Sequence, residues 1–208
     1  MAILARDQLI DRLRSSDPAK VLVVSPILTD TQISAASIDL RMGNVALMVR
    51  ARGSSHVEPK VTLQGANATL LQQAEIDSRQ RHERYEIPFK SKFLLHPGSL
   101  ALVPTLEWVA LPNDLHGAVT AKSTWAREGL SIATATFVEP GYRGIITLEL
   151  ANLGEIPITL YPGLRLAQIA FATVLGNPKR NDKPQFQLSF EPKQGELAKI
   201  EDKPFLPT

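Results

Sequence analysis

The feature that most constrains the fold is a series of short apolar runs separated by turn signals between residues 93 and 173. Pro-Gly pairs stand at 97–98, 140–141 and 162–163. Such a pair is typical of a tight turn, because proline presets φ and glycine accepts positive φ. The runs recur at roughly the 8–12-residue spacing of short antiparallel strands. With 15 prolines and 12 glycines in 208 residues, the pattern predicts a mainly β protein, an antiparallel barrel or sandwich.

The N-terminal part predicts one helix followed by further strands. Residues 6–15 fit a short amphipathic helix, with Leu9, Ile10 and Leu13 on one face. The stretches VLVVSPIL and SIDLRMGNVALMV that follow are β-like.

Two polar segments interrupt or follow the predicted strands. Residues 51–92 have few apolar positions, and we interpret them as an insertion, a loop or a short exposed helix, within one domain spanning 1–175. Residues 176–208 are polar and rich in proline, which predicts a C-terminal arm.

The composition excludes several classes of chemistry. The chain has no cysteine, which removes disulfides, thiol nucleophiles and cysteine-ligated zinc. Its four histidines form no H-E-x-x-H pattern, so we interpret them as surface or structural residues. The net charge of +2 argues against a nucleic-acid-binding protein, although the pI of about 8.9 would suit a local anion pocket. Charges interrupt the N-terminal apolar residues, and no run approaches the ~20 residues of a membrane span, so we expect a soluble cytoplasmic protein.

A carboxylate interrupts the apolar run GIITLELAN at 144–152. Period-two alternation puts Ile146, Leu148 and Leu150 on one face of a strand and Glu149 on the other. Taken alone, the pattern favours a side chain that points to solvent. The alternative is a carboxylate held in a functional site.

The stretch TAKSTWAREGL at 120–130 gathers Lys122, Ser123, Thr124 and Arg127. Two cations, two hydroxyls and the backbone amides of a turn or helix start can form a phosphate cradle. The alternative is a solvated turn in which one of the hydroxyls caps a short helix. The arginine can also pair with a buried carboxylate.

Together, LLHPGSLALVPTLEWVALPNDLHGAVTAKSTWAREGL and TFVEPGYRGIITLELANLGEIPITLYPGLRLAQIAF resemble the dCTP deaminase branch of the dUTPase-like superfamily. SIDLRMGN also matches that branch, and the resemblance covers residues 1–50 and 93–173. It implies a distorted antiparallel β-barrel or jelly-roll that assembles as a homotrimer with active sites between subunits. It also implies deamination of dCTP to dUTP without zinc, with Mg²⁺ bound through the triphosphate and dTTP as a candidate regulator. The absence of cysteine agrees, because zinc deaminases use cysteine ligands.

The resemblance assigns catalytic and phosphate-binding roles to five positions. Glu149 matches the glutamate that activates water and passes protons to the leaving amino group. Arg127 would keep that carboxylate ionised and help to order the water. Ser123 would bind phosphate or the water, and Lys122 and Thr124 would contact the triphosphate. A partly desolvated, paired carboxylate can serve as base and then as acid in such a reaction.

Four more positions are matched to substrate or water contacts. The backbone carbonyl of Ala135 would hold the nucleophilic water, and Tyr142 matches an aromatic residue near the sugar. Gln168 matches a glutamine that contacts phosphate. Glu139 stands where the family has an aspartate that touches the deoxyribose 3′-hydroxyl. The extra methylene moves the carboxylate by roughly 1 Å, a misplacement large enough to impair a second, hydrolytic activity.

Two further departures from the family pattern bear on the site. Trp125 replaces a small aliphatic residue, and we expect it to pack rather than to narrow the pocket. The arm lacks the usual Tyr/Lys/Gln-rich closing segment, for which Lys193 and Gln194 are the available substitutes.

The leading hypothesis is a dCTP deaminase that supplies dUTP to pyrimidine deoxynucleotide metabolism. One alternative is a dUTP pyrophosphatase, or a bifunctional enzyme that forms dUMP. The other is a non-catalytic nucleotide-binding or interaction module on the same fold. The joint presence of Lys122, Ser123, Arg127 and Glu149 favours an enzyme.

Overall fold

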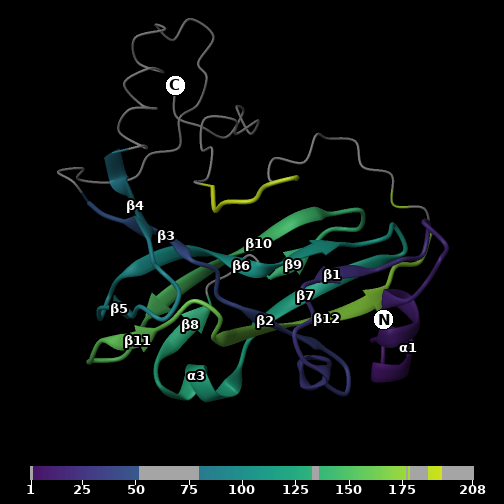
Figure 1. Ribbon diagram of the computed structural model, residues 1–208, viewed down its shortest axis with the longest axis horizontal. Coiled ribbons are helices and arrows are strands. Elements are labelled where there is room, and N and C mark those ends of the chain that lie inside the picture. Colours follow the sequence, from purple (N-terminus) through teal and green to yellow (C-terminus); the bar gives the residue numbers. More distant parts are fainter. Residues whose placement is uncertain (1, 52–79, 133–135, 177, 179–186, 194–208) are drawn as a thin grey trace, which may run out of the picture.

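The structure is a computed structural model that describes residues 2–51, 80–132, 136–176, 178 and 187–193. These residues form mainly antiparallel strands (Figure 1), as the turn-punctuated sequence predicts. None of the helices in these ranges has the length and apolar character needed to cross a membrane.

A six-stranded antiparallel sheet forms one layer of the molecule. Its strands, in chain order, are β1 (Val23–Ser25), β3 (Val45–Val49), β4 (His82–Glu86), β6 (Leu100–Ala110), β8 (Leu130–Ile132) and β10 (Arg143–Asn152). They follow the order β4-β3-β6-β10-β8, and β1 pairs with the end of β6. The register places Glu149 of β10 opposite Leu102 of β6, and a bulge separates Ile145 from Thr147.

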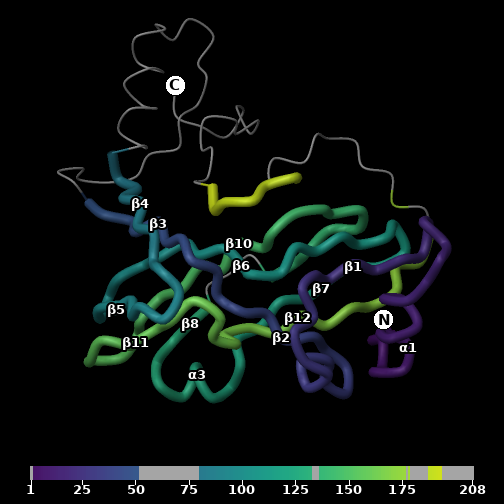
Figure 2. The backbone as a smooth tube through the Cα atoms, in the orientation of Figure 1, coloured from purple at the N-terminus to yellow at the C-terminus, as the bar shows by residue number. Residues whose placement is uncertain are grey.

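A four-stranded sheet forms the second layer, and the remaining elements flank the two. This sheet has the order β2-β12-β7-β9, with the strands β2 (Ile38–Arg41), β7 (Leu115–Ala121), β9 (Phe137–Val138) and β12 (Arg165–Thr173). The flanking elements are the pair β5 (Phe93–Leu95) and β11 (Ile158–Leu160), and the helices α1 (Arg6–Leu13), η1 (Asp30–Gln32) and α3 (Ser123–Arg127). Figure 2 shows α1 at one end of the body, with α3 on the side away from β10.

The core lies between the two sheets. Ile146, Leu148 and Leu150 of β10 are 6%, 1% and 0% exposed, which confirms the predicted alternation of this strand. From the other sheet, Ile169 and Phe171 of β12 enter the same core and are fully buried. Because neighbouring side chains in a strand point to opposite sides, Glu149 and Gln168 lie on the outward sides of two different sheets.

The three Pro-Gly pairs form turns as predicted. Gly98, Gly141 and Gly163 have φ values of +68°, +73° and +94°, a region that L-residues with a Cβ rarely occupy. The turn at Gly141 leads directly into β10 and therefore helps to set the register of the strand that carries Glu149.

The interpretation of residues 51–92 as a loop or an exposed helix is wrong for the segment 82–86. These residues form β4, which pairs with β3 from Val45–Glu86 to Val49–His82. The sequence HERYE shows no apolar alternation because β4 is an edge strand, and charged side chains are common on such edges. Residues 52–79 lie outside the described part of the chain.

Part of the C-terminal arm contacts the first sheet. The backbone N–H of Leu188 donates to the carbonyl of Arg143 at 2.7 Å, and that of Ile145 donates to the carbonyl of Ser189 at 3.1 Å. Arg84 of β4 forms an ion pair with Glu191 at 2.9 Å. Residues 188–191 of the arm thus lie beside the first residues of β10 and beside β4, while Gln194 lies outside the described residues.

Candidate functional site

The predicted phosphate loop begins the helix α3. Lys122 is the N-cap residue, and its carbonyl accepts the backbone N–H groups of Trp125 at 3.0 Å and Ala126 at 3.2 Å. No side chain caps this helix, so the alternative in which Ser123 or Thr124 serves as its cap is wrong. Both hydroxyl side chains are exposed and therefore accessible to a ligand.

A buried carboxylate holds the lysine of this loop. One oxygen of Asp39 accepts the Nζ of Lys122 at 2.7 Å, and the other accepts Nη1 of Arg165 at 3.3 Å. Asp39 is 2% exposed, whereas the two cations reach the surface. The Arg165 guanidinium is also fixed by the hydroxyls of Thr29 and Thr31 at 2.8 and 3.0 Å. Two cations against one carboxylate leave one positive charge at the loop.

The sequence reasoning did not single out Asp39 or Arg165. Each stands in a segment that carries the family resemblance, SIDLRMGN for the first and GLRLAQIAF for the second. That placement is the signal that would have pointed to both residues.

Trp125 packs against the core, which confirms the packing interpretation of this departure from the family pattern. Its indole Nε1–H donates to the backbone carbonyl of Arg165 at 3.0 Å. The loop helix is therefore attached to the start of β12 by a side chain, in addition to the ion pairs through Asp39.

Gln168 lies in the middle of the second sheet, beside the loop. Its backbone pairs with Asp39 on one side and with Thr120 on the other. Its side-chain amide donates to the Thr120 hydroxyl at 3.3 Å. The structure thus brings together Lys122, Gln168 and Asp39, which are far apart in the sequence, on one outward surface.

Glu149 is half-buried on the outward side of β10. The residue takes part in an interaction within the chain, and it is neither fully exposed nor fully buried. Its cross-strand neighbour Leu102 is also half-buried. A carboxylate on an apolar sheet surface is partly desolvated, which a general base requires.

Arg127 ends α3, and its side chain is exposed. The helix contacts β8, and Ile132 of β8 pairs with Leu150, the residue after Glu149. β10, which carries Glu149, therefore lies next to β8, and α3, which carries Arg127, contacts β8.

Two of the other predicted residues flank the turn before β10. The side chain of Glu139 is exposed, and its carbonyl accepts the backbone N–H of Tyr142 at 3.1 Å. The Tyr142 hydroxyl donates to the carbonyl of Ile145, and burial raises the pKa of this phenol to about 12. That hydroxyl is already used inside the chain, which leaves the ring as the part available to a ligand. Ala135 lies outside the described residues.

A second buried charge cluster, which the sequence reasoning missed, supports the first. Glu107 is fully buried and accepts from Arg41 twice, from the backbone N–H at 2.8 Å and from Nη1 at 3.0 Å, and from Nε2 of Gln32 at 2.9 Å. Burial raises the pKa of Glu107, and the hydrogen bonds from Arg41 oppose this effect. Gln32 also donates to the backbone carbonyl of Asp39 at 3.0 Å, so this cluster fixes the strand that carries the loop carboxylate.

Within the described ranges, no group of three His, Asp or Glu side chains is arranged to hold a metal ion. Magnesium that arrives with a triphosphate needs no such cage, because phosphate oxygens and water supply most of its ligands.

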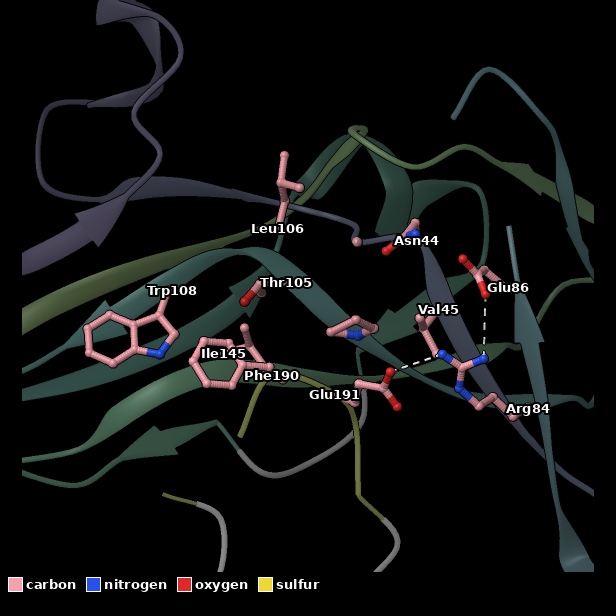
Figure 3. A pocket seen from close by; sticks show the side chains of 12 residues that line it. Asn44, Val45, Arg84, Glu86, Thr105, Leu106, Trp108, Ile145, Phe190 and Glu191 are labelled. Carbon is pink, nitrogen blue, oxygen red and sulfur yellow. Dashed lines mark hydrogen bonds and ion pairs between the residues drawn. The ribbon is translucent and has the colours of Figure 1, made fainter. Parts of the chain in front are cut away.

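A pocket of about 340 Å³ lies away from the predicted residues, between β3, β4, β6 and residues 190–191 of the arm. Figure 3 shows Trp108 and Phe190 along one part of its wall and Arg84, joined to Glu86 and Glu191, at another. None of the residues predicted for the site lines this pocket, so it does not change the location of the candidate site.

Comparisons with known proteins identify the family of this chain. A family model described as dCTP deaminase-like matches residues 3–174. A dCTP deaminase, dUMP-forming, of Methanobrevibacter smithii is 33% identical over 178 residues, which are 82% of this chain and 85% of the relative. A dCTP deaminase of Pectobacterium atrosepticum is 32% identical over 183 residues, 88% of this chain and 91% of the relative.

Among solved structures, the crystal structure of a 2′-deoxycytidine 5′-triphosphate deaminase from Agrobacterium tumefaciens matches with a TM-score of 0.56 and 27% identity. The match covers 81% of this chain and 47% of that structure, so the chain spans about half of its length. The family model covers most of the chain, and the two relatives cover more than two thirds of it. The chain therefore belongs to the dCTP deaminase-like family.

Proposed function

We propose that this protein catalyses the hydrolytic deamination of dCTP to dUTP and ammonia, without zinc, in pyrimidine deoxynucleotide metabolism. The observation that carries the proposal is Glu149, a half-buried acidic residue on the outward side of β10, opposite Leu102. The names of the relatives in the dCTP deaminase-like family support the same substrate.

The chemistry needs one group that first accepts and then donates protons. Water adds to C4 of cytosine while Glu149 takes a proton from it and N3 of the ring becomes protonated. The amino group then receives a proton and leaves as ammonia, and the C4 carbonyl forms. A base of this kind contributes on the order of 10²–10⁴-fold to the rate. Arg127 would help to order the water, and Ser123 would hold the water or a phosphate oxygen.

The triphosphate would bind at the loop of α3. Lys122 and Arg165 leave one net positive charge beside Asp39, and the exposed hydroxyl of Thr124 adds a donor. Gln168 lies on the same outward surface. Magnesium would be bound through the nucleotide, where it neutralises phosphate charge.

The positions of the residues support an assembly with shared sites. Glu149 and Gln168 lie on the outward sides of two sheets that enclose one core. A single substrate can contact both residues most simply where one copy of the chain meets another. We therefore propose the homotrimer implied by the resemblance, with each site at a boundary between subunits.

A second candidate function is the further hydrolysis of dUTP to dUMP. The Methanobrevibacter smithii relative carries the description dUMP-forming. Glu139 is exposed in the turn before β10, where a carboxylate is available to a second water.

Product analysis separates these functions. Purified protein is incubated with dCTP and Mg²⁺, with dUTP and dCMP as parallel substrates. Ammonia with dUTP supports the deaminase, whereas ammonia with pyrophosphate and dUMP supports the bifunctional enzyme. Binding of dCTP without turnover supports the non-catalytic module and refutes the proposal. Adding dTTP to the same assay tests whether it regulates the reaction.

The Glu149→Gln variant tests the assignment of the base. It should release no ammonia and should still bind dCTP, because the amide keeps the size of the side chain but cannot accept the proton. The exposed Glu155 provides a matched control, and Glu155→Gln should turn over normally. Normal turnover by Glu149→Gln, or loss of dCTP binding, would contradict the role. The molecular mass in solution tests the trimer.

A further inference from the structure

An exposed aromatic ring lies on the same outward surface as the candidate phosphate site. Phe137 of β9 is 57% exposed, while the next residue, Val138, is buried in the core. Strand alternation therefore directs Phe137 outward. It pairs directly with Ala118 of β7, and Ala118 pairs in turn with Ala170 of β12. This row lies beside the row formed by Thr120 and Gln168.

A buried histidine on the same side of β7 as Ala118 packs against the ring. The rings of His116 and Phe137 are stacked, with centroids 4.8 Å apart and planes inclined by 15°. His116 is 6% exposed, and neither of its ring nitrogens has a hydrogen-bond partner in the structure. Phe137 covers the imidazole with one face and therefore presents its other face to solvent. A nearly fully buried polar ring without a hydrogen-bond partner is uncommon in folded proteins.

The spacing between the aromatic ring and the cationic loop fits one class of ligand. Ala118 and Lys122 are four residues apart along one extended segment, which corresponds to ~13 Å at about 3.3 Å per residue. That span is comparable to the distance from the base to the terminal phosphates of an extended nucleoside triphosphate. Small side chains, Ala118, Thr120 and Ala170, separate the two ends and leave room for a sugar.

We propose that Phe137, stacked on His116, is the platform on which the pyrimidine nucleoside part of the substrate packs. The inference rests on the proposed function and adds a substrate-binding residue to it. Any base offers a π-face to an exposed ring, so the contact contributes affinity without reading the base edge. In this arrangement Lys122 binds the phosphates at one end of the surface, and Phe137 contacts the base of the same ligand at the other end.

Equilibrium binding to the full chain tests the platform. The measurement uses the Glu149→Gln background, in which dCTP should not be consumed. Phe137→Ala should weaken dCTP binding on the order of tenfold and leave inorganic tripolyphosphate binding unchanged, because tripolyphosphate has no base to stack. Phe137→Tyr should restore the affinity for dCTP. Phe89 is equally exposed at 57% and stands between β4 and β5, outside the sheet that carries Phe137, so Phe89→Ala should bind both ligands as the parent does.

Three results would overturn the platform. The first is a Phe137→Ala variant that binds dCTP as tightly as the parent does. The second is equal loss of dCTP and tripolyphosphate with a lower melting temperature, which would make Phe137 structural. The third is a change in molecular mass, which would place Phe137 in a contact between subunits. If the wild-type protein releases ammonia from dCTP and any of these three results is found, the proposed function stands and only the platform is refuted. If dCTP binding depends on the Phe137 ring but the wild-type protein does not turn dCTP over, the proposed function is refuted and the platform is supported.

Discussion

Removal of the Glu107 carboxylate should destabilise the protein more than removal of both Glu107 and its partner Arg41. Glu107 is fully buried, and the side chain of Arg41 is 7% exposed. Three hydrogen bonds of 2.8 to 3.0 Å end on this carboxylate. Glu107→Leu would leave a guanidinium and a backbone N–H of Arg41 in the core without their acceptor.

The expected loss follows from the burial of the pair. Breaking a buried ion pair by removing one partner costs about 3–5 kcal/mol of the free energy of unfolding. At about 2–4 °C per kcal/mol for a chain of this size, the melting temperature should fall by roughly 6–20 °C. The double variant Glu107→Leu/Arg41→Met should recover most of this loss, because no charge is then left in the core. The Arg41 backbone N–H remains unsatisfied, which costs about 1–3 kcal/mol.

The pH dependence gives an independent check of the same pair. Burial raises the pKa of Glu107 above its ordinary value, so the folded chain holds this proton more tightly than the unfolded chain does. The stability contributed by the protonated group is fully present below the ordinary glutamate pKa and is lost as the pH rises through the raised value. The stability of the wild type relative to the double variant should therefore decrease from acid toward neutral pH.

Thermal melts followed by circular dichroism at several pH values provide the measurement. Glu155→Gln, a substitution at an exposed carboxylate, should change the stability by no more than about 0.5 kcal/mol. A single variant at Glu107 that melts with the wild type would refute the reasoning. So would a double variant as unstable as the single one, or a stability difference that does not vary with pH.

Three further outcomes are expected. Trp125→Leu should lower the free energy of unfolding by about 1–3 kcal/mol in chemical denaturation, because the indole loses core contacts and its hydrogen bond to Arg165; unchanged stability would show that the indole does not fasten α3. In an alkaline absorbance titration, Tyr142 should ionise only near a pKa of about 12, and Tyr142→Phe should remove this late step. The stability linked to this phenol is present below the ordinary tyrosine pKa and is lost as the pH rises through about 12. Arg127→Ala should reduce turnover while the melting temperature shifts by no more than about 2 °C, since the side chain is exposed; a large loss of stability would mean that this arginine is structural.

The features that sequence reasoning predicted correctly depend only on residues that are adjacent along the chain. The Pro-Gly pairs form turns because proline and glycine restrict their own dihedral angles, whatever surrounds them. The alternation of Ile146, Leu148 and Leu150 follows from the geometry of a single strand. Packing of Trp125 follows from its size and apolar character.

The features that sequence reasoning missed depend on which strands pair with one another. Lys122 and Asp39 are 83 positions apart, and Arg41 and Glu107 are 66 apart, so neither pair is visible without the register of the sheets. β4 escaped prediction because the polar segment 82–86 carries no alternation when both of its faces are near solvent. Such an edge strand is recognised only from its partner β3.

The division of the site between two surfaces has the same origin. Alternation in β10 predicts that Glu149 faces away from the core, and alternation in β12 predicts the same for Gln168. Only the packing of the two sheets shows that these outward directions diverge, because Leu148 and Ile169 both belong to the core between them. If both residues act on one substrate, the second surface must come from another copy of the chain. The half-buried position of Glu149 on one isolated chain fits this requirement, because an approaching subunit would complete its desolvation.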